Sequence, residues 1–382
     1  MKEKLSKRIL TLISIVSLML LIVMIVVTGA CAKPAPAPAP APSPATSPAP
    51  APAPAKPITL VFSYFEPPQS IYWVKLFKPW FDEVENLTEG RVKVEAHLAG
   101  ELASLLEAYD ATVRGAVDMA FVFPMMHPEI FPMQDIGTMC SHDVYGTNYS
   151  RIIWELYGTF PEMVAEYTNS GTKVIWAGLN DTCGVVSTKK AGPIRTIADM
   201  KGLKATCTGK AAGDRQEALG LVSVSLPPEE CVMSFKTGVL DCGCCSTYLL
   251  RDMGWGPVTS YLTVPVQYTQ GVLAIVINLD TWNSFPDDVK KIWEETGEAN
   301  IDVWDELALQ ANIEGIASAT KDFGTEVIEF PKEELAKAAA LDKPVREAWA
   351  AELEAKGLPG KKLLDEFLRL EQKYSLPENP FM

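Results

Sequence analysis

The chain has 382 residues and a formal net charge of −14, because 34 basic side chains stand against 48 acidic ones. From Ile58 onward the count is 28 basic and 47 acidic side chains, a net charge of −19 over 325 residues. Such an acidic surface repels a phosphate backbone, which excludes nucleic-acid binding. A hydrophobic fraction of 48% is enough for two or three domains with substantial cores.

Residues 1–30 predict an export signal. They begin with a basic stretch, continue with a long apolar run that carries no charge, and end in Gly29 and Ala30. The run could also cross a bilayer as an uncleaved anchor. Cys31 after Thr-Gly-Ala resembles the lipobox of bacterial lipoproteins, which implies that the signal is removed and Cys31 is acylated. Both alternatives place the rest of the chain outside the cytoplasm, and the lipobox makes it lipid-anchored at the membrane.

Residues 31–57 form a linker that contains 11 of the 29 prolines, most of them alternating with alanine. Proline has no backbone N–H, so this segment is unsuited to a helix interior or a sheet ladder. We expect an extended polyproline spacer of about 3.1 Å per residue. The linker would hold the following domain away from the membrane.

The segment after the linker alternates between strand and helix patterns. Short apolar or alternating runs indicate strands, and apolar residues at spacings of three and four indicate helices. Within the first helix, Pro79 should cause a kink or mark the true start. The succession predicts an α/β lobe with a mainly parallel sheet. The strand candidates are 58–63, 91–96 and 117–122, and the helix candidates are 70–87 and 101–114.

A second α/β stretch follows and leads into an unusually long helix. Ser284 is the predicted N-cap of a helix from Pro286 to about Lys321, which is about 54 Å at 1.5 Å per residue. A helix of that length must cross more than one lobe. The strand candidates here are 173–177, 185–188, 203–207 and 272–278, and two more helices are expected at 332–356 and 360–374.

Four stretches resemble the solute-binding proteins of tripartite ATP-independent periplasmic (TRAP) transporters. They are TEGRVKVEAHLAGELASLLEAYDATVRGAVDMAFV (88–122), IRTIADMKGLKATCTG (194–209), PPEECVMSFKTGVLDCGCC (227–245) and VINLDTWNSFPDDVKKIWEE (276–295). They occur in the family's order and cover most of residues 58–330.

This resemblance implies an α/β, two-lobe fold like that of periplasmic binding proteins, with a long cross-bracing helix. It implies a receptor that closes on a small organic solute, an organic acid or a less charged compound, and delivers it to TRAP membrane permease subunits. Delivery of a signal to a sensor is a further alternative. No enzymatic activity, catalytic residue or cofactor is expected. The expected division is lobe I at 58–180 with about 272–300, lobe II at 181–271 with about 301–330, and C-terminal helices packed on the lobes at 331–382.

The resemblance also shows where this sequence departs from the family. Members usually hold a ligand carboxylate with arginine, which offers bidentate geometry. One such arginine falls on Thr206 and a second around Val185 or Val186, and a family asparagine falls on Cys245. The ligand should therefore depend less on a single carboxylate than in typical relatives.

Nine residues are predicted ligand contacts, because they follow strand ends or align with cleft positions of the family. Lys210 and Arg215 are candidates for a replacement positive charge. The nine are Phe65, Glu66, Phe123, Met125, Thr206, Cys207, Pro228, Cys242 and Cys245.

Seven cysteines follow Cys31, and an odd number in an exported domain implies at least one free thiol or an intermolecular bond. An oxidising exterior favours a disulfide such as Cys207–Cys245 or Cys183–Cys207. Small buried thiols lining an uncharged pocket are another interpretation. The C-x-C-C spacing of 242–245 differs from the C-x-x-C of structural zinc, so no metal is predicted. A cysteine-based metal-binding or redox lipoprotein on the same scaffold is the alternative function.

Overall fold

The computed structural model describes residues 57–142, 144, 149–179, 183–266, 271–376 and 381. The predicted export signal, the lipid anchor at Cys31 and all but the last residue of the linker lie outside these ranges. Within them, no helix combines the length and the apolar character needed to span a bilayer.

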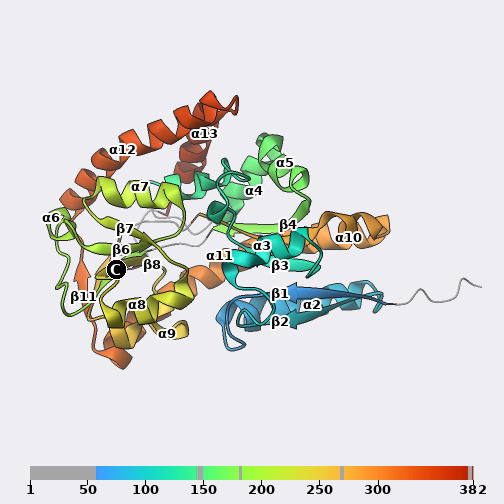
Figure 1. The fold of residues 1–382 in the computed structure, drawn as a ribbon, viewed down its shortest axis with the longest axis horizontal. Helices are drawn as coiled ribbons and strands as arrows, with labels where there is room; N and C mark the ends of the chain where they lie inside the picture. Colours follow the sequence, from blue (N-terminus) through green and yellow to red (C-terminus); the bar gives the residue numbers. More distant parts are fainter. Residues whose placement is uncertain are drawn as a thin grey trace, which may run out of the picture. The chain divides into compact units, whose positions relative to one another are not determined.

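The first of two sheets has the strand order β2-β1-β3-β10-β4, and Figure 1 labels β1, β2, β3 and β4 of this sheet. β1 pairs in parallel with β2 and β3, whereas β10 runs antiparallel to both β3 and β4. The prediction of a mainly parallel sheet was therefore wrong in part, because β10 returns late in the chain between β3 and β4. The bounds are β1 Ile58–Ser63, β2 Val92–His97, β3 Met119–Val122, β4 Thr172–Leu179 and β10 Val272–Asn278.

The second sheet has the order β11-β9-β5-β8-β6-β7. β6 is parallel to β7 and β8, and β5 is antiparallel to β8 and β9. We call each sheet with its helices a lobe, the first lobe and the second lobe. The α/β two-lobe prediction is confirmed. The bounds are β5 Gly184–Ser187, β6 Lys204–Cys207, β7 Val222–Ser225, β8 Cys242–Cys245, β9 Tyr261–Val264 and β11 Glu326–Glu329.

The helix predicted at 70–87 has an irregular start. A π-helical turn at Trp73–Phe77 (η1) leads into α2, Lys78–Leu87, with Pro79 in its first turn. Proline is tolerated in the first turn of a helix because the N–H groups there have no partner within the helix, so the N–H that proline lacks is not needed. α3 is Leu105–Val113 and begins at a capping box formed by Ser104 and Glu107.

Short helices complete the two lobes. In the first lobe these are η2 Pro124–Met126, η3 Gln134–Met139, α4 Tyr149–Thr159, α5 Pro161–Asn169 and α10 Leu279–Ser284. In the second they are α6 Ile197–Met200, α7 Lys210–Ala218, η4 Pro228–Glu230, α8 Cys231–Thr237, α9 Leu249–Asp252 and η5 Gly256–Val258.

The long helix α11 spans Asp287–Phe323 and packs against β4 and α4 of the first lobe and against α9 and β11 of the second. This confirms the predicted cross-brace. Its N-cap is Pro286 and not Ser284, whose hydroxyl donates to the Thr281 carbonyl and so belongs to the end of α10.

Two glycines let α11 approach the backbone of both lobes. A Cβ atom at Gly297 would lie 2.2 Å from the carbonyl oxygen of Ile175 in β4. At Gly315 it would lie 2.4 Å from the carbonyl oxygen of Thr247, which follows β8. One close contact per lobe therefore fixes the helix against both sheets.

Two C-terminal helices, α12 (Lys332–Ala355) and α13 (Gly360–Lys373), match the predicted ranges closely. α12 packs against α7 of the second lobe, and α13 packs against α4 and η3 of the first. In Figure 1 the red α12 leads from the β11 side of the second lobe to α13. These helices thus provide a second link between the lobes.

Candidate ligand-binding cleft

A cavity of about 410 Å³ opens between the two lobes. The carboxyl ends of β3, β6 and β7 lie beside it, the arrangement in which α/β sheets commonly bind ligands. Its lining includes Met125 and Met126 from the first lobe and Cys207, Lys210, Ser225 and Pro227 from the second.

The lobes contact each other at this cavity through Gly209. Its φ of +85° lies in the region that favours glycine, and a Cβ atom there would come within 2.8 Å of the Met125 carbonyl oxygen. Gly209 is also the N-cap of α7. The first turn of α7 therefore starts at the cavity, with the partial positive charge of a helix N-terminus.

Glu66 forms a second contact between the lobes. Tyr248 of the second lobe donates its hydroxyl to Glu66 Oε1 at 3.1 Å. On the same lobe as Glu66, Tyr64 donates to Oε2 at 2.7 Å and Ser70 also donates to Oε2. Burial raises the pKa of Glu66, and these hydroxyl donors partly oppose that rise. Glu66 thus lies at the interface between the lobes, where its oxygens accept bonds from both.

Tyr248 is a contact between the lobes that the sequence reasoning missed. Its ring packs edge-on against Tyr72 of the first lobe, with centroids 5.2 Å apart. It follows the carboxyl end of β8 by three residues. The rule that selected Met125 after β3 would have found it, had the Cys-rich β8 been assigned as a strand.

The predicted contacts in the first lobe are all buried. Met125 lines the cavity directly. Phe65 and Phe123 belong to the same buried cluster as Met125, and their ring centroids lie 5.7 Å apart. The structure therefore gathers these residues with Glu66 after the ends of β1 and β3.

The predicted contacts in the second lobe are more scattered. Cys207 lines the cavity. Thr206 bonds to the carbonyl of Leu226 at 3.4 Å, and Pro228 accepts from the Trp255 indole N–H at 3.3 Å. Cys245 is fully buried at the end of β8. The Thr206 hydroxyl and the Pro228 carbonyl therefore already have partners within the lobe.

Cys242 lies at the amino end of β8, away from the strand ends at the cavity. It pairs with Ser187 on β5 and Ala205 on β6. Its side chain packs in a separate buried cluster with Ile194 and Met200. Cys242 does not line the cavity, because three residues of strand, about 10 Å, separate it from the carboxyl end of β8.

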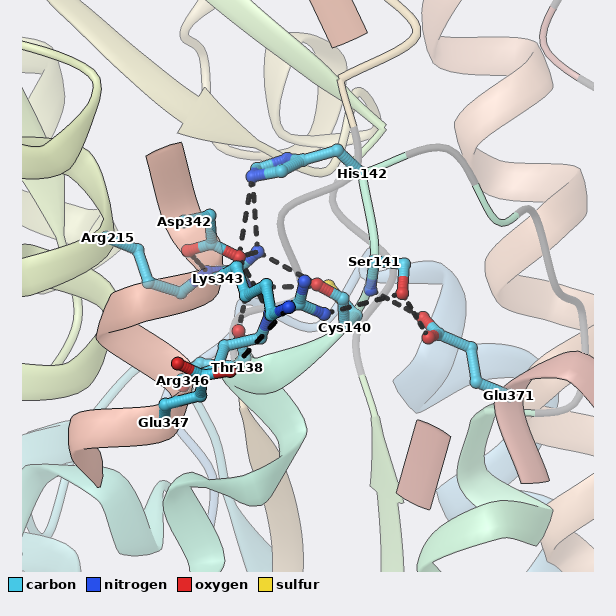
Figure 2. Close-up of polar contacts among 10 residues, drawn as sticks. All are labelled: Thr138, Cys140, Ser141, His142, Arg215, Asp342, Lys343, Arg346, Glu347 and Glu371. Carbon is cyan, nitrogen blue, oxygen red and sulfur yellow. Dashed lines mark hydrogen bonds and ion pairs between the residues drawn. The ribbon is translucent and has the colours of Figure 1, made fainter. Parts of the chain in front are cut away.

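Arg215 does not supply the expected replacement charge. Its side chain is fully buried, and Nε and Nη2 donate to the two carboxylate oxygens of Asp342 at 2.6 and 2.8 Å. It also donates to the carbonyls of Thr138 and Cys140 (Figure 2). The guanidinium is thus occupied by α12 and by the segment at the end of η3.

Lys210 is the cation that lines the cavity. Its side chain is 59% exposed, and Nζ lies 2.6 Å from Asp214 one turn further along α7. Glu217 also lines the cavity. The local charge is therefore one ammonium group and the N-terminus of α7 against two carboxylates.

Cys207 and Cys245 are free, buried thiols, so the disulfides Cys207–Cys245 and Cys183–Cys207 do not form here. Burial raises the pKa of the Cys207 thiol to about 11 and that of Cys244 to about 12. Thiols with such pKa values stay protonated at neutral pH and are poor metal ligands and nucleophiles. Within the described ranges no three His, Cys, Asp or Glu side chains gather as metal ligands. Nothing supports the metal or redox alternative.

Residues 62–353 match the family described as bacterial extracellular solute-binding protein, family 7. The chain belongs to this family. Among characterised relatives, the chain is 25% identical over 289 residues to a monocarboxylate 2-oxoacid-binding periplasmic protein of a Nostoc species, covering 70% of this chain and 77% of that protein. It is 24% identical over 317 residues to the outer membrane transporter protein TsaT of Comamonas testosteroni, covering 80% of this chain and 90% of that protein.

Solved structures of TRAP solute-binding proteins share the family 7 fold. A Rhodoferax ferrireducens protein in complex with benzoate has a TM-score of 0.76 at 22% identity, covering 83% of this chain and 98% of that one. A Bordetella bronchiseptica protein with bound mandelate has a TM-score of 0.74 at 20% identity, covering 83% and 99%. The resemblance to TRAP solute-binding proteins in the sequence is confirmed, and the protein is a solute receptor of this transport family.

Proposed function

We propose that the protein captures one small organic monocarboxylate in the cavity between the lobes and delivers it to TRAP permease subunits in the membrane. The observation that carries the proposal is the cavity itself, placed where strand ends of both lobes meet and lined by Lys210 beside the first turn of α7. The binding of benzoate, mandelate and 2-oxoacids by similar proteins supports an organic acid.

The cavity chemistry favours one carboxylate joined to an apolar body. Met125, Met126, Leu226 and Pro227 offer apolar surface. Lys210 and the amide groups at the start of α7 would meet the carboxylate, in place of the arginines that the family usually provides. A dicarboxylate would bring a second negative charge toward Asp214 and Glu217, which the single ammonium group cannot offset.

The expected effect of Lys210→Met is a loss of at least about tenfold in affinity for the acid, since one charge contact of about 1.4 kcal/mol accounts for that factor. A thermal-shift screen of aromatic and 2-oxo monocarboxylates, their amides and matched dicarboxylates identifies the ligand, and calorimetry then compares the variants. Lys236→Met, at an exposed position on α8, is the matched control and should bind like the wild type.

Equal affinity of Lys210→Met and wild type for the acid would contradict the assignment of Lys210. Tighter binding of a neutral amide than of the acid by the wild type would favour the less charged solute.

We also propose that Cys31 carries a lipid that holds the receptor at the membrane. The lipobox-like sequence before Cys31 and the linker that follows support this. Radiolabelled palmitate should be incorporated into the wild-type protein and not into Cys31→Ser, and a membrane-bound wild type that takes up no label would favour an uncleaved anchor.

A further inference from the structure

A second cavity, of about 350 Å³, lies between η3, α7 and α12. It shares Pro128, Lys210 and Asp214 with the ligand cleft, but the rest of its lining comes from Pro132, η3, Ala211 of α7 and α12 and not from the strand ends. The buried network of Arg215 and Asp342 in Figure 2 involves the same three segments. The network therefore helps to hold the walls of this cavity in place.

Asp135 on η3 lines the second cavity and is only 5% exposed. Its Oδ1 atom accepts no hydrogen bond from the described part of the chain. The hydroxyl of Thr138 donates to the backbone carbonyl of Asp135 and leaves its carboxylate without that donor. A buried acceptor without a donor is unfavourable, so a ligand that donates a hydrogen bond to Asp135 would be stabilised here.

The charges around Asp135 favour a cationic donor. Lys210 Nζ lies 2.6 Å from Asp214 and 3.7 Å from Glu352, so its charge is shared by two other carboxylates. With Lys356, the cavity holds two ammonium groups against three carboxylates. An added cation would balance these charges.

The pKa of Asp135 agrees with this arrangement. Burial raises it to about 7, Lys210 and Lys356 lower it, and Asp214 and Glu352 raise it. Near neutral pH the carboxyl is therefore partly protonated, and a cation beside it would shift it to the ionised form.

The rest of the wall is apolar. Trp349 and Val345 on α12 and Met139 on η3 line the cavity together with Pro132 and Leu353. An occupant that fills the space must therefore combine one charged end with an apolar body.

We propose that this second cavity binds a small primary amine with an apolar or aromatic body, with its ammonium group donating to Asp135 and its body packed against Trp349. The site adjoins the cleft that takes the transported solute, but Asp135 and Trp349 line only this second cavity. Because its walls come from η3 of the first lobe and α7 of the second, an occupant would favour the state in which these elements lie together.

Calorimetric titration of the whole chain with 2-phenylethylamine at neutral pH tests the proposal, with 2-phenylethanol as the neutral probe of the same shape. The amine should bind at least tenfold more tightly than the alcohol. Asp135→Asn should weaken amine binding at least tenfold. Glu129→Gln, which removes an exposed carboxylate between η2 and η3, should not change amine binding. Glu352→Gln keeps Asp135 in place and should weaken amine binding several-fold, which covers the case in which Asp135→Asn fails to fold.

Ser225→Trp distinguishes binding at this site from binding in the cleft, because Ser225 lines the cleft cavity and does not line the second cavity. Amine binding should survive this substitution. Loss of amine binding in Ser225→Trp would place the amine in the cleft and overturn the proposal. Equal binding by wild type and Asp135→Asn, equal binding of amine and alcohol, or no binding of the amine would also overturn it.

Discussion

Arg215→Ala is expected to lower the free energy of unfolding by about 3–5 kcal/mol, or to prevent folding, because it leaves Asp342 as a buried carboxylate without its main partner. Both side chains are fully buried. The change also removes the bonds that tie α7 to the carbonyls of Thr138 and Cys140, so the second lobe loses a link to the first. Urea denaturation followed by circular dichroism measures the effect.

Two further variants make the Arg215 result interpretable. Arg369→Ala removes an exposed arginine paired with Glu366 on α13 and should leave the free energy of unfolding nearly unchanged. The double variant Arg215→Met with Asp342→Leu removes both buried charges and should recover much of the stability. A loss below about 1 kcal/mol for Arg215→Ala would show that the network does not hold the three segments together.

The second large effect concerns Asp305 on α11, which is buried and accepts the Ser150 N–H at 3.2 Å on both oxygens. Burial raises its pKa from 3.8 to about 8. Between about pH 4 and pH 8 the folded state therefore keeps a proton on Asp305 that the unfolded state has already released. The contribution of Asp305 to the free energy of unfolding is fully present below about pH 4 and is lost as the pH rises through about 8.

Asp305→Asn should therefore increase the free energy of unfolding at pH 9 by roughly 2–5 kcal/mol relative to wild type, and should flatten its pH dependence. Urea denaturation at pH 5, 7 and 9 provides the measurement. Asp302→Asn, an exposed carboxylate one turn away that pairs with Arg151, should leave the slope unchanged. An Asp305→Asn slope equal to that of wild type would mean that Asp305 is not buried as a neutral acid.

The sequence correctly predicted the elements in which the apolar pattern extends over many residues. The apolar periodicity of α11 extends over ten turns, and the predicted limits at 286 and 321 differ from the observed helix by at most two residues. The four strands that the sequence did not predict, β7, β8, β9 and β11, all belong to the second lobe. Each has four residues, which is too few positions for an alternating pattern to be recognised. The mixed sheet was missed because alternation of strands and helices reveals the order of elements but not the return of β10.

At the site, the strand-end rule located Met125, three residues after β3, and the resemblance to the family located Cys207, the last residue of β6. The partner of Arg215 could not be predicted, because Asp342 lies 127 residues later on a helix that the motifs do not cover. Burial and pairing decide whether an arginine can meet a ligand, and neither is visible in one sequence. Lys210 remained available because its position on the first turn of α7 keeps it at the cavity.

The central claim is that the solute binds in the cavity between the lobes, and calorimetry with the acid found in the screen tests it most directly. Ser225 is exposed and lines the cavity, so Ser225→Trp should fill the space without disturbing the core. The account predicts one binding site per chain in the wild type and an affinity at least about tenfold lower in Ser225→Trp, with unchanged urea denaturation. Unchanged affinity in a folded Ser225→Trp protein would place the solute elsewhere and contradict the account.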